Sequence, residues 1–337
     1  MKIFMIGGTG LLGSQAADEL IRRGHDVSSV ALPPAPAGAN LPPKMKLEFG
    51  NYMEMTDGEL ANHFEGCEGF VFAAGVDERV EGPAPIYEMF KKYNITPLQR
   101  LLRVAKQCGV QRAVVCGSYF CYFDKLWPEK ELTKWHPYIR SRRDQEDMAL
   151  SFADENFHVS MLELPYIFGA QPGRKPVWTF LVEMINSMKR TTMYPKGGTT
   201  MVTVRQVGEA VAGAMEKNRG ANCYPIGYYN LTWVEMLKIM HKYMGRPDKK
   251  ITTIPNWMYA LGMKKIMRER KAKGQEGGLN MVKFTDLQTS NLFIDKSLGC
   301  EPLGVLPDDI DAAIGESVTL CRSVIKGETQ VIGMKGE

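Results

Sequence analysis

The sequence predicts an α/β protein: a Rossmann-like, doubly wound parallel sheet followed by a smaller mixed α/β C-terminal region. Residues 3–6 (IFMI) form a short apolar run that ends in a glycine turn, and residues 11–23 then place apolar side chains at helical spacing. Short apolar segments continue to alternate with helical patterns up to about residue 170. Such alternation is typical of a parallel sheet covered by helices on both faces.

The glycine turn is the strongest local signal. Its glycines are Gly7, Gly10 and Gly13. At such a junction glycine permits a tight turn, leaves the backbone bare beside a pyrophosphate, and lets helix and strand pack closely. The free amides at the start of the helix would face the phosphates. With Thr9, Leu11 and Leu12 they are the candidate residues for a dinucleotide cradle.

The remaining elements follow from periodicity and from glycine and proline breaks. Strands are expected at residues 26–31, 46–50, 69–74, 113–116 and 159–163, and near 200–203 and 223–226. Helices are expected at residues 56–64, 85–108, 177–189, 204–216, 232–243 and 310–325. Residues 32–43 contain five prolines and are expected to form an irregular loop.

We expect three parts in the chain. Residues 1–170 would form the dinucleotide-binding domain, with some later segments returning to it. Residues 171–325 would form the substrate-binding region, in which residues 257–278, rich in Met, Lys and Arg, are interpreted as a mobile lid. Residues 326–337 would form a frayed tail.

Composition narrows the class of protein. A net charge of +4 gives no case for binding nucleic acid or a membrane. The apolar run at the N-terminus is too short for a signal peptide, and no segment is apolar for long enough to span a bilayer. The seven cysteines lack CxxC spacing, which favours reduced thiols over disulfides or a metal site. We therefore expect a cytoplasmic protein without a bound metal.

Several motifs together resemble the extended short-chain dehydrogenase/reductases, the NAD-dependent epimerase/dehydratase superfamily. Thr9, Gly10 and Gly13 match its T-G-x-x-G run, Ser118 and Tyr122 match S-x-x-x-Y, and residues 137–142 (PYIRSR) match P-Y-x-x-S-K. One departure is clear, because Arg142 stands where the family has lysine. Phe123 and Phe168 also replace a glycine and a tyrosine of the family pattern.

The resemblance implies a set of catalytic residues. Tyr138 would be the acid/base, Ser118 would hydrogen-bond the substrate oxygen, and Arg142 would take the place of the lysine that lowers the tyrosine pKa and holds the nicotinamide ribose. Asn94 matches a family asparagine that lies under the active site. Arg142 supplies a permanent charge, but it is bulkier than lysine and cannot lose a proton.

The resemblance also implies a cofactor, NAD or NADP. The implied cofactor-binding residues beyond the glycine turn are Leu32, Asn51, Tyr52, Ala73, Ala74, Gly75, Pro165 and Ile167. Neither an acidic residue, as for NAD, nor a basic one, as for NADP, ends the strand at 26–31. Lys44 and Lys46 give a weak preference for NADP.

We therefore predict an NAD(P)-dependent reductase or dehydrogenase that acts on a ketone or secondary alcohol of a small molecule. The alternatives are a nucleotide-sugar epimerase or dehydratase with tightly bound NAD, and a dinucleotide-sensing protein without catalysis. Aromatic residues crowd positions 119–127 and 166–178, which favours a substrate with a broad apolar body. The family resemblance further suggests a homodimer.

Overall fold

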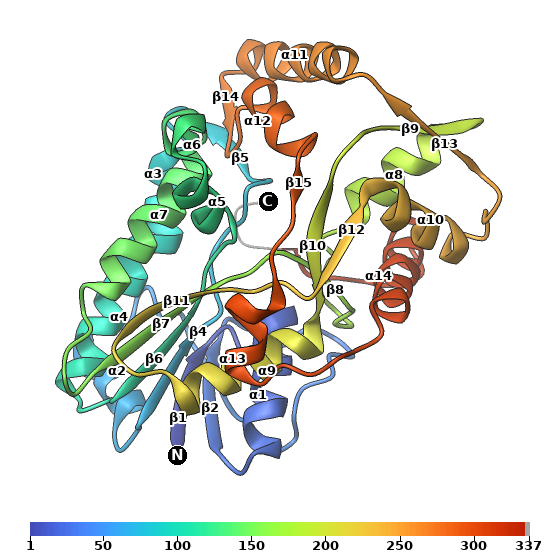
Figure 1. The fold of residues 1–337 in the computed structure, drawn as a ribbon. Coiled ribbons are helices and arrows are strands. Elements are labelled where there is room, and N and C mark those ends of the chain that lie inside the picture. The colour runs from blue at the N-terminus through green and yellow to red at the C-terminus, as the bar shows by residue number, and fades with distance from the viewer. Residues whose placement is uncertain (334–337) are drawn as a thin grey trace.

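Seven parallel strands form the main sheet (Figure 1). The structure is a computed structural model and describes residues 1–333. In spatial order the strands are β3 (Lys46–Phe49), β2 (Asp26–Ala31), β1 (Lys2–Ile6), β4 (Gly69–Phe72), β6 (Arg112–Cys116), β7 (His158–Glu163) and β11 (Ala221–Pro225). This order confirms the predicted Rossmann-like sheet, and because all pairs are parallel the carboxyl ends of the strands share one edge.

Both faces of this sheet are buried, as the continuous apolar runs predict. In β1, Ile3 and Met5 join one core cluster, whereas Phe4 and Ile6 join a second cluster on the opposite face. The helices that cover the first face are α1 (Leu11–Arg22), α9 (Val204–Lys217) and α13 (Cys300–Leu303). Those that cover the second are α2 (Asp57–Phe64), α4 (Thr96–Gln107) and α7 (Pro137–Leu150).

A second, smaller region lies beside the carboxyl edge of the main sheet (Figure 1). Its sheet joins β8 (Tyr166–Phe168), β10 (Gly198–Thr203), β12 (Tyr229–Thr232) and β15 (Asn291–Leu292). Around it pack α8 (Thr179–Ser187), α10 (Trp233–Tyr243) and α14 (Ile310–Ile325), which share a core cluster. A parallel pair, β9 (Thr191–Pro195) and β13 (Lys250–Ile254), extends its outer side.

The upper part of the molecule in Figure 1 holds the remaining elements. They are α3 (Tyr87–Phe90), α5 (Phe120–Leu126), α6 (Leu132–Trp135), α11 (Asn256–Ala272), α12 (Met281–Gln288) and the antiparallel pair β5 (Glu81–Pro83) and β14 (Gln275–Gly277). Two single 3-10 turns (Pro128–Lys130 and Lys296–Leu298) and one π-helical turn (Lys91–Ile95) complete the described secondary structure.

Two local expectations need correction. The single helix expected at residues 85–108 is divided into α3, a π-helical turn (Lys91–Ile95) and α4, and the π turn directs Asn94 into the protein. The segment interpreted as a mobile lid contains most of α11 and all of β14, and its mobility stays a prediction. In the tail, Ile332 pairs with Arg174 and is not frayed there, whereas residues 334–337 lie outside the described part.

Candidate active site

The glycine turn has the geometry that a dinucleotide cradle requires. Gly7 has φ of 97°, and a Cβ on it would lie 2.4 Å from the carbonyl oxygen of Ala73. A Cβ on Gly13 would lie 2.1 Å from the carbonyl oxygen of Gly7. A side chain at either position would collide with backbone, so the close approach of β1, α1 and the end of β4 depends on both glycines.

The start of α1 is open to a phosphate. Gly10 is the N-cap residue of α1, and within residues 1–333 no side chain caps the helix there. The first amides of the helix therefore keep their hydrogen-bonding capacity, which suits a pyrophosphate. The residues present thus fit the dinucleotide that the sequence implies.

Arg174 lies over the same turn. Its Nη2 donates to Thr9 Oγ1 at 2.8 Å, and its Nε donates to the Thr9 carbonyl oxygen at 3.3 Å. Partial burial lowers the pKa of this guanidinium, but it stays charged at neutral pH. Arg174 was not among the predicted cofactor-binding residues, so its place at this turn is new.

Tyr138 and Arg142 meet one helical turn apart on α7. Arg142 Nε donates to the Tyr138 hydroxyl at 3.1 Å, and both side chains are buried. The spacing of four residues places them on the same helix face, as the sequence predicts. The structure therefore brings the phenol and the guanidinium together.

The other donors of Arg142 are also engaged. Nη1 donates to Gln145 Oε1 at 2.8 Å, and Nη2 donates to the Val76 carbonyl oxygen at 3.3 Å. Gln145 in turn donates from Nε2 to the Asn94 carbonyl oxygen at 2.7 Å. Gln145 was not predicted, although its position three residues after Arg142 places it on the same face of α7.

Asn94 holds the loop that follows β4. Its Oδ1 accepts from the Val76 amide at 2.8 Å, and its Nδ2 donates to the Val76 carbonyl oxygen at 3.0 Å. A Cβ on Gly75 would lie 2.5 Å from Asn94 Oδ1 and 3.9 Å from Arg142 Nη1. Only glycine at position 75 allows this approach, so the predicted residues Gly75, Asn94, Arg142 and Tyr138 form one connected group.

Four other predicted residues come after strands of the main sheet, at the same edge as this group. Leu32 follows β2, Asn51 follows β3, Ser118 follows β6, and Pro165 follows β7. The hydroxyl of buried Ser118 accepts from the Phe120 amide at 3.4 Å, and the Phe120 ring packs edge-on against Tyr138. The sites predicted for the cofactor and the substrate therefore share one edge, as parallel topology requires.

Asn51 and Tyr52, two of the implied cofactor-binding residues, have their own surroundings. Asn51 Oδ1 accepts from the amide of Met53 at 3.2 Å, and Tyr52 lines a cavity of about 330 Å³ between α2 and α4. Lys46 pairs with Ser28 at the amino end of β3, far from the end of β2 at Ala31. Lys46 is therefore badly placed for a ribose phosphate.

Burial sets the proton affinity of the phenol. It raises the pKa of Tyr138 to about 12, Arg142 opposes the rise, and the charge of Glu78 adds to it. Tyr138 therefore carries its proton at neutral pH in this structure. Such a phenol is set to donate a proton to an oxygen placed beside it.

Glu78 is a residue that sequence reasoning missed. It is half-buried in the loop after β4, and burial together with the charge of Asp77 raises its pKa to about 7. Burial is the main cause of the raised pKa of Tyr119, and the charge of Glu78 raises that pKa further. The Glu78 carbonyl oxygen and Tyr138 Cβ both lie within 3.0 Å of the point where a Cβ on Gly278 would stand. A lone Glu in a loop gave no signal in the sequence.

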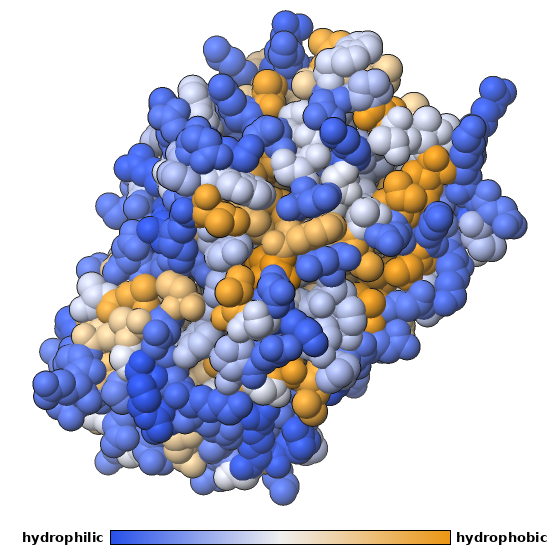
Figure 2. Space-filling view, viewed as in Figure 1, coloured by the Kyte–Doolittle hydropathy of each residue, from blue (hydrophilic) through white to orange (hydrophobic). Residues whose placement is uncertain are grey.

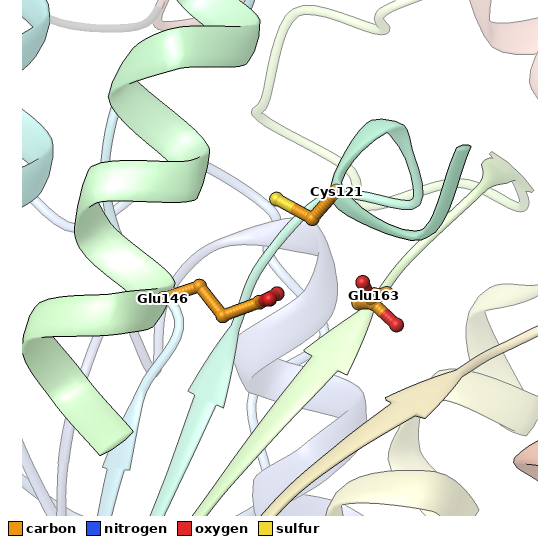
Figure 3. A group of neighbouring side chains, drawn as sticks. All are labelled: Cys121, Glu146 and Glu163. Atoms are coloured by element: carbon orange, nitrogen blue, oxygen red, sulfur yellow. The ribbon is translucent and has the colours of Figure 1, made fainter. Parts of the chain in front are cut away.

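A buried group of ionisable side chains lies beside the site (Figure 3). Cys121 of α5, Glu146 of α7 and Glu163 of β7 point toward one another, with ligand-type atoms within 4.8 Å. Lys125 Nζ lies 2.9 Å from Glu146 Oε1 and 2.8 Å from Glu163 Oε1. The ammonium thus already supplies the positive charge between the carboxylates, and we assign the group a structural role.

His136 makes a structural contact at the start of α7. It is buried at the start of α7, and its Nδ1 accepts from the Asn280 amide at 3.2 Å. Burial lowers its pKa to about 4, so it remains neutral above that pH. Its contact joins α7 to the segment between β14 and α12.

The fold and this site together define an enzyme of the extended short-chain dehydrogenase/reductase type. A model of the NAD dependent epimerase/dehydratase family matches residues 3–227, and the chain belongs to this family. The class of cofactor follows from the family, which is NAD-dependent. The chain is thus an oxidoreductase of that family.

Two curated proteins show the distance to known relatives. The chain is 21% identical over 332 residues to a putative dihydroflavonol 4-reductase of Synechocystis sp., covering 94% of this chain and 93% of that protein. It is 28% identical over 122 residues to a 3-beta-hydroxysteroid dehydrogenase of Mycolicibacterium neoaurum. This second match spans only 35% of the chain and 32% of that relative.

Solved structures share the fold at low sequence identity. The crystal structure of gox2253 has a TM-score of 0.73 and 19% identity, covering 98% of this chain and 99% of that one. MoeE5 in complex with UDP-glucose and NAD has a TM-score of 0.62 and 18% identity, covering 96% and 100%. Among residues 1–333 no helix is both long and apolar enough to cross a bilayer.

Proposed function

We propose that the protein catalyses NAD(P)-dependent interconversion of a ketone and a secondary alcohol on a small molecule with an apolar body. The supporting observation is the buried contact of 3.1 Å between Arg142 Nε and the hydroxyl of Tyr138, beside Gly75 at the cofactor edge of the sheet. A bound nicotinamide would supply or accept the hydride.

Each residue of the chain has a definite part in this proposal. Tyr138 gives its proton to the substrate oxygen during reduction and takes it back during oxidation. Arg142 stabilises negative charge on the phenol oxygen through its Nε–H. Ser118 donates a hydrogen bond to the same substrate oxygen. Gln145 and Asn94 act through Arg142 and the loop at Val76, which they hold in place.

The partners of two basic side chains favour a reductase over an enzyme that acts on nucleotide sugars. A diphosphate substrate needs uncommitted cations, for which the sequence offers Arg174, Lys175, Lys196 and Arg205. Arg174 is bound to Thr9 at the cofactor turn. Arg205 is paired with Glu209 at 2.5 Å and with Asp308 at 3.0 Å.

Cofactor choice follows from what surrounds the end of β2. Leu32 supplies neither a carboxylate for two ribose hydroxyls nor a cation for a 2′-phosphate. Lys46 lies at the far end of β3, away from the end of β2. Only Lys44 then supports NADP, so the preference for NADP is weak. We therefore propose that the enzyme uses NAD or NADP, with NADP weakly favoured.

The decisive experiment is Tyr138→Phe, assayed with NADH and NADPH against a panel of cyclic and aryl ketones. We expect turnover to fall by at least ~100-fold, as for the loss of a general acid. Cofactor affinity, measured by quenching of protein fluorescence, should change little. Tyr87→Phe is the matched control, since the Tyr87 hydroxyl also donates to a charged residue of α7, Asp144, away from the site.

Other outcomes would identify the alternatives. Purified protein that carries tightly bound NAD and converts a UDP-sugar without net redox change is an epimerase. Protein that binds cofactor, but in which Tyr138→Phe leaves the rate with an active ketone unchanged, refutes the catalytic assignment. The proposal also includes a homodimer formed through residues 85–108 and 138–156 and a cytoplasmic location. A monomer in light scattering at micromolar concentration would exclude the dimer.

A further inference from the structure

Helix α11 has two faces of different character. Its inner face carries Tyr259, Met263, Met267 and Arg270, which are half-buried at helical spacing. This face packs toward α12 and β14, and Arg270 Nη2 lies 2.5 Å from Glu81 Oε1 on β5. The helix is thus attached to the protein by one side only, and it has no fully buried residue.

The outer face divides into an apolar and a basic half. Trp257, Met258 and Leu261 near the helix start are 63%, 42% and 55% exposed. Lys264, Arg268 and Lys271 continue the same stripe, because residues 257, 261, 264, 268 and 271 are spaced by three or four. Lys265, four residues after Leu261, lies on the same side of the helix and is exposed. Exposed aromatic and leucine side chains on a helix cost free energy in water unless something covers them.

Charge is concentrated on this helix. Asn256–Ala272 contains five basic residues and one acidic residue. The net charge of this helix is therefore +4, the same as the net charge of the whole chain. In Figure 2 hydrophobic and hydrophilic side chains are mixed over α11 at the top of the molecule. Clusters of Lys and Arg are attracted to anionic bilayer surfaces, and exposed Trp and Leu side chains beside such a cluster enter the boundary between headgroups and acyl chains.

We propose that the outer face of α11 binds the surface of an anionic lipid bilayer. Trp257, Met258 and Leu261 enter the boundary between headgroups and acyl chains, and Lys264, Lys265 and Arg268 contact lipid phosphates. A second copy of the chain is disfavoured on this face, because a two-fold interface over the apolar half would leave the basic half without a partner of opposite charge. Nucleic acid would leave the apolar half uncovered.

The position of the helix makes this binding relevant to the active site. After α11 the chain enters β14, and the Gly278 carbonyl oxygen then accepts from the Tyr138 amide at 2.9 Å. Burial raises the pKa of Tyr259 on the inner face to about 12. Lipid binding through α11 would place the candidate active site beside the bilayer. This consequence rests on the proposed function, whereas lipid binding itself does not rest on it.

The test is cosedimentation of the full chain with vesicles of phosphatidylcholine alone or with added phosphatidylserine. We expect binding to the anionic vesicles only, weakened by high salt. Trp257→Ser/Leu261→Ser and Lys264→Gln/Lys265→Gln/Arg268→Gln should each reduce the partition coefficient by at least ~10-fold. Circular dichroism should show both variants folded, because the altered side chains are exposed.

Matched controls remove similar groups elsewhere. Phe49→Ser/Leu306→Ser alters two apolar residues that are 55% and 57% exposed. Lys242→Gln/Lys296→Gln/Lys326→Gln removes three charges from exposed lysines outside α11. Both controls should bind vesicles like the unaltered protein.

Three results would overturn the proposal. The first is no binding to anionic vesicles. The second is binding that both α11 variants retain. The third is self-association, or binding to duplex DNA, that Trp257→Ser/Leu261→Ser abolishes while vesicles remain unbound. Since none of these measurements uses turnover, failure here leaves the proposed reaction untouched, and loss of the reaction leaves lipid binding untouched.

Discussion

At the scale of single residues, the site depends on how Arg142 distributes its donors. Three different nitrogens reach Tyr138, Gln145 and the Val76 carbonyl oxygen. A guanidinium supplies these donors from a planar fork, whereas lysine supplies all of its donors from one atom. The surroundings of Arg142 therefore offer an acceptor to each of its three nitrogens, which a lysine at this position could not use together.

Arg142→Lys tests this reading. An ammonium cannot reach all three acceptors, so buried Gln145 Oε1 or the Val76 carbonyl oxygen loses its donor. The loss of one charged hydrogen bond amounts to about 1.5–3 kcal/mol, and we expect kcat/KM to fall roughly 10-fold or more with a lower Tm. Steady-state kinetics and thermal melts measure both. A clear gain in activity would mean that arginine is a compromise at this position.

Glu78 gives the site a second ionisation. Its pKa of about 7 lies well below that of Tyr138, and its negative charge raises the pKa of the phenol. As pH rises through about 7, Glu78 loses its proton and Tyr138 becomes a weaker acid. The rate of reduction should therefore fall across this range.

Glu78→Gln should remove that fall, because the amide stays neutral. The measurement is the pH profile of kcat/KM for reduction from about pH 5 to about pH 9. Asp18→Asn, an exposed change on α1, serves as the control and should keep the original profile. An unaltered ionisation near pH 7 in Glu78→Gln would assign it to another group.

At the scale of elements, α7 joins the catalytic residues to the rest of the fold. Its inner face presents Tyr138, Arg142 and Gln145, and one turn further Glu146 faces Glu163 at the end of β7. Within the described residues neither carboxylate oxygen of Glu163 has a hydrogen-bond partner, although Lys125 is close. The junction of α5, α7 and β7 therefore contains a carboxyl group that ionises with difficulty.

The pH dependence of stability should report this group. Burial, then repulsion from Glu146, raises the folded-state pKa of Glu163 to about 7 from 4.5. Between these values the folded protein binds more protons than the unfolded chain, so stability falls as pH rises from about 4.5 through about 7. In Glu163→Gln the fall in Tm from about pH 5 to about pH 8 should be smaller.

Calorimetry at several pH values makes the comparison, with exposed Glu155→Gln as the control. Asp57 and Glu59 have pKa values lowered by hydrogen bonds, so their effects lie at lower pH. Glu78, whose pKa is also about 7, acts in the same window in both proteins, so the difference between the two profiles reports Glu163. Profiles of wild type and Glu163→Gln that run parallel across the range would show that Glu163 is ionised throughout.

At the scale of the whole molecule, local patterns predicted what local physics controls. The glycine turn, the apolar strands and the spacing of Tyr138 and Arg142 are set within a few residues, and the structure has them. The π turn at Asn94 depends instead on packing against the Val76 loop, which no periodicity records. Glu78, Gln145 and Arg174 reach their positions through tertiary contacts, so their roles were not visible in the sequence.

Whole-chain averages also hid local properties. The net charge of +4 predicted no membrane binding, yet α11 concentrates that charge on one exposed helix. The vesicle experiment decides between these two statements. Similarly, residues 326–337 were expected to fray because they end the chain. In the structure the Ile332 amide donates to the Gly173 carbonyl oxygen at 2.9 Å.

Arg174 connects these distant parts of the chain. Its backbone pairs with Ile332 near the C-terminus, while its side chain reaches Thr9 in the glycine turn. A cofactor pyrophosphate at the start of α1 would lie beside this guanidinium, and charge-assisted hydrogen bonds would follow. Cofactor binding should therefore tighten the contact between the N-terminal sheet and the C-terminal region.

Arg174→Ala separates the side chain from the backbone pairing, which alanine retains. One charged hydrogen bond contributes about 1.5–3 kcal/mol, so we expect cofactor affinity to fall at least ~10-fold. Saturating cofactor stabilises a protein by about 2.7 kcal/mol at 100 times Kd, and a tenfold weaker complex loses about half of that. The rise in Tm on adding NADPH should shrink accordingly, and Tm without cofactor should also fall, because the two hydrogen bonds to Thr9 are lost. Arg190→Ala, an exposed change beside β9, is the control. An undiminished rise in Arg174→Ala would show that the guanidinium stays on Thr9 and does not contact the cofactor.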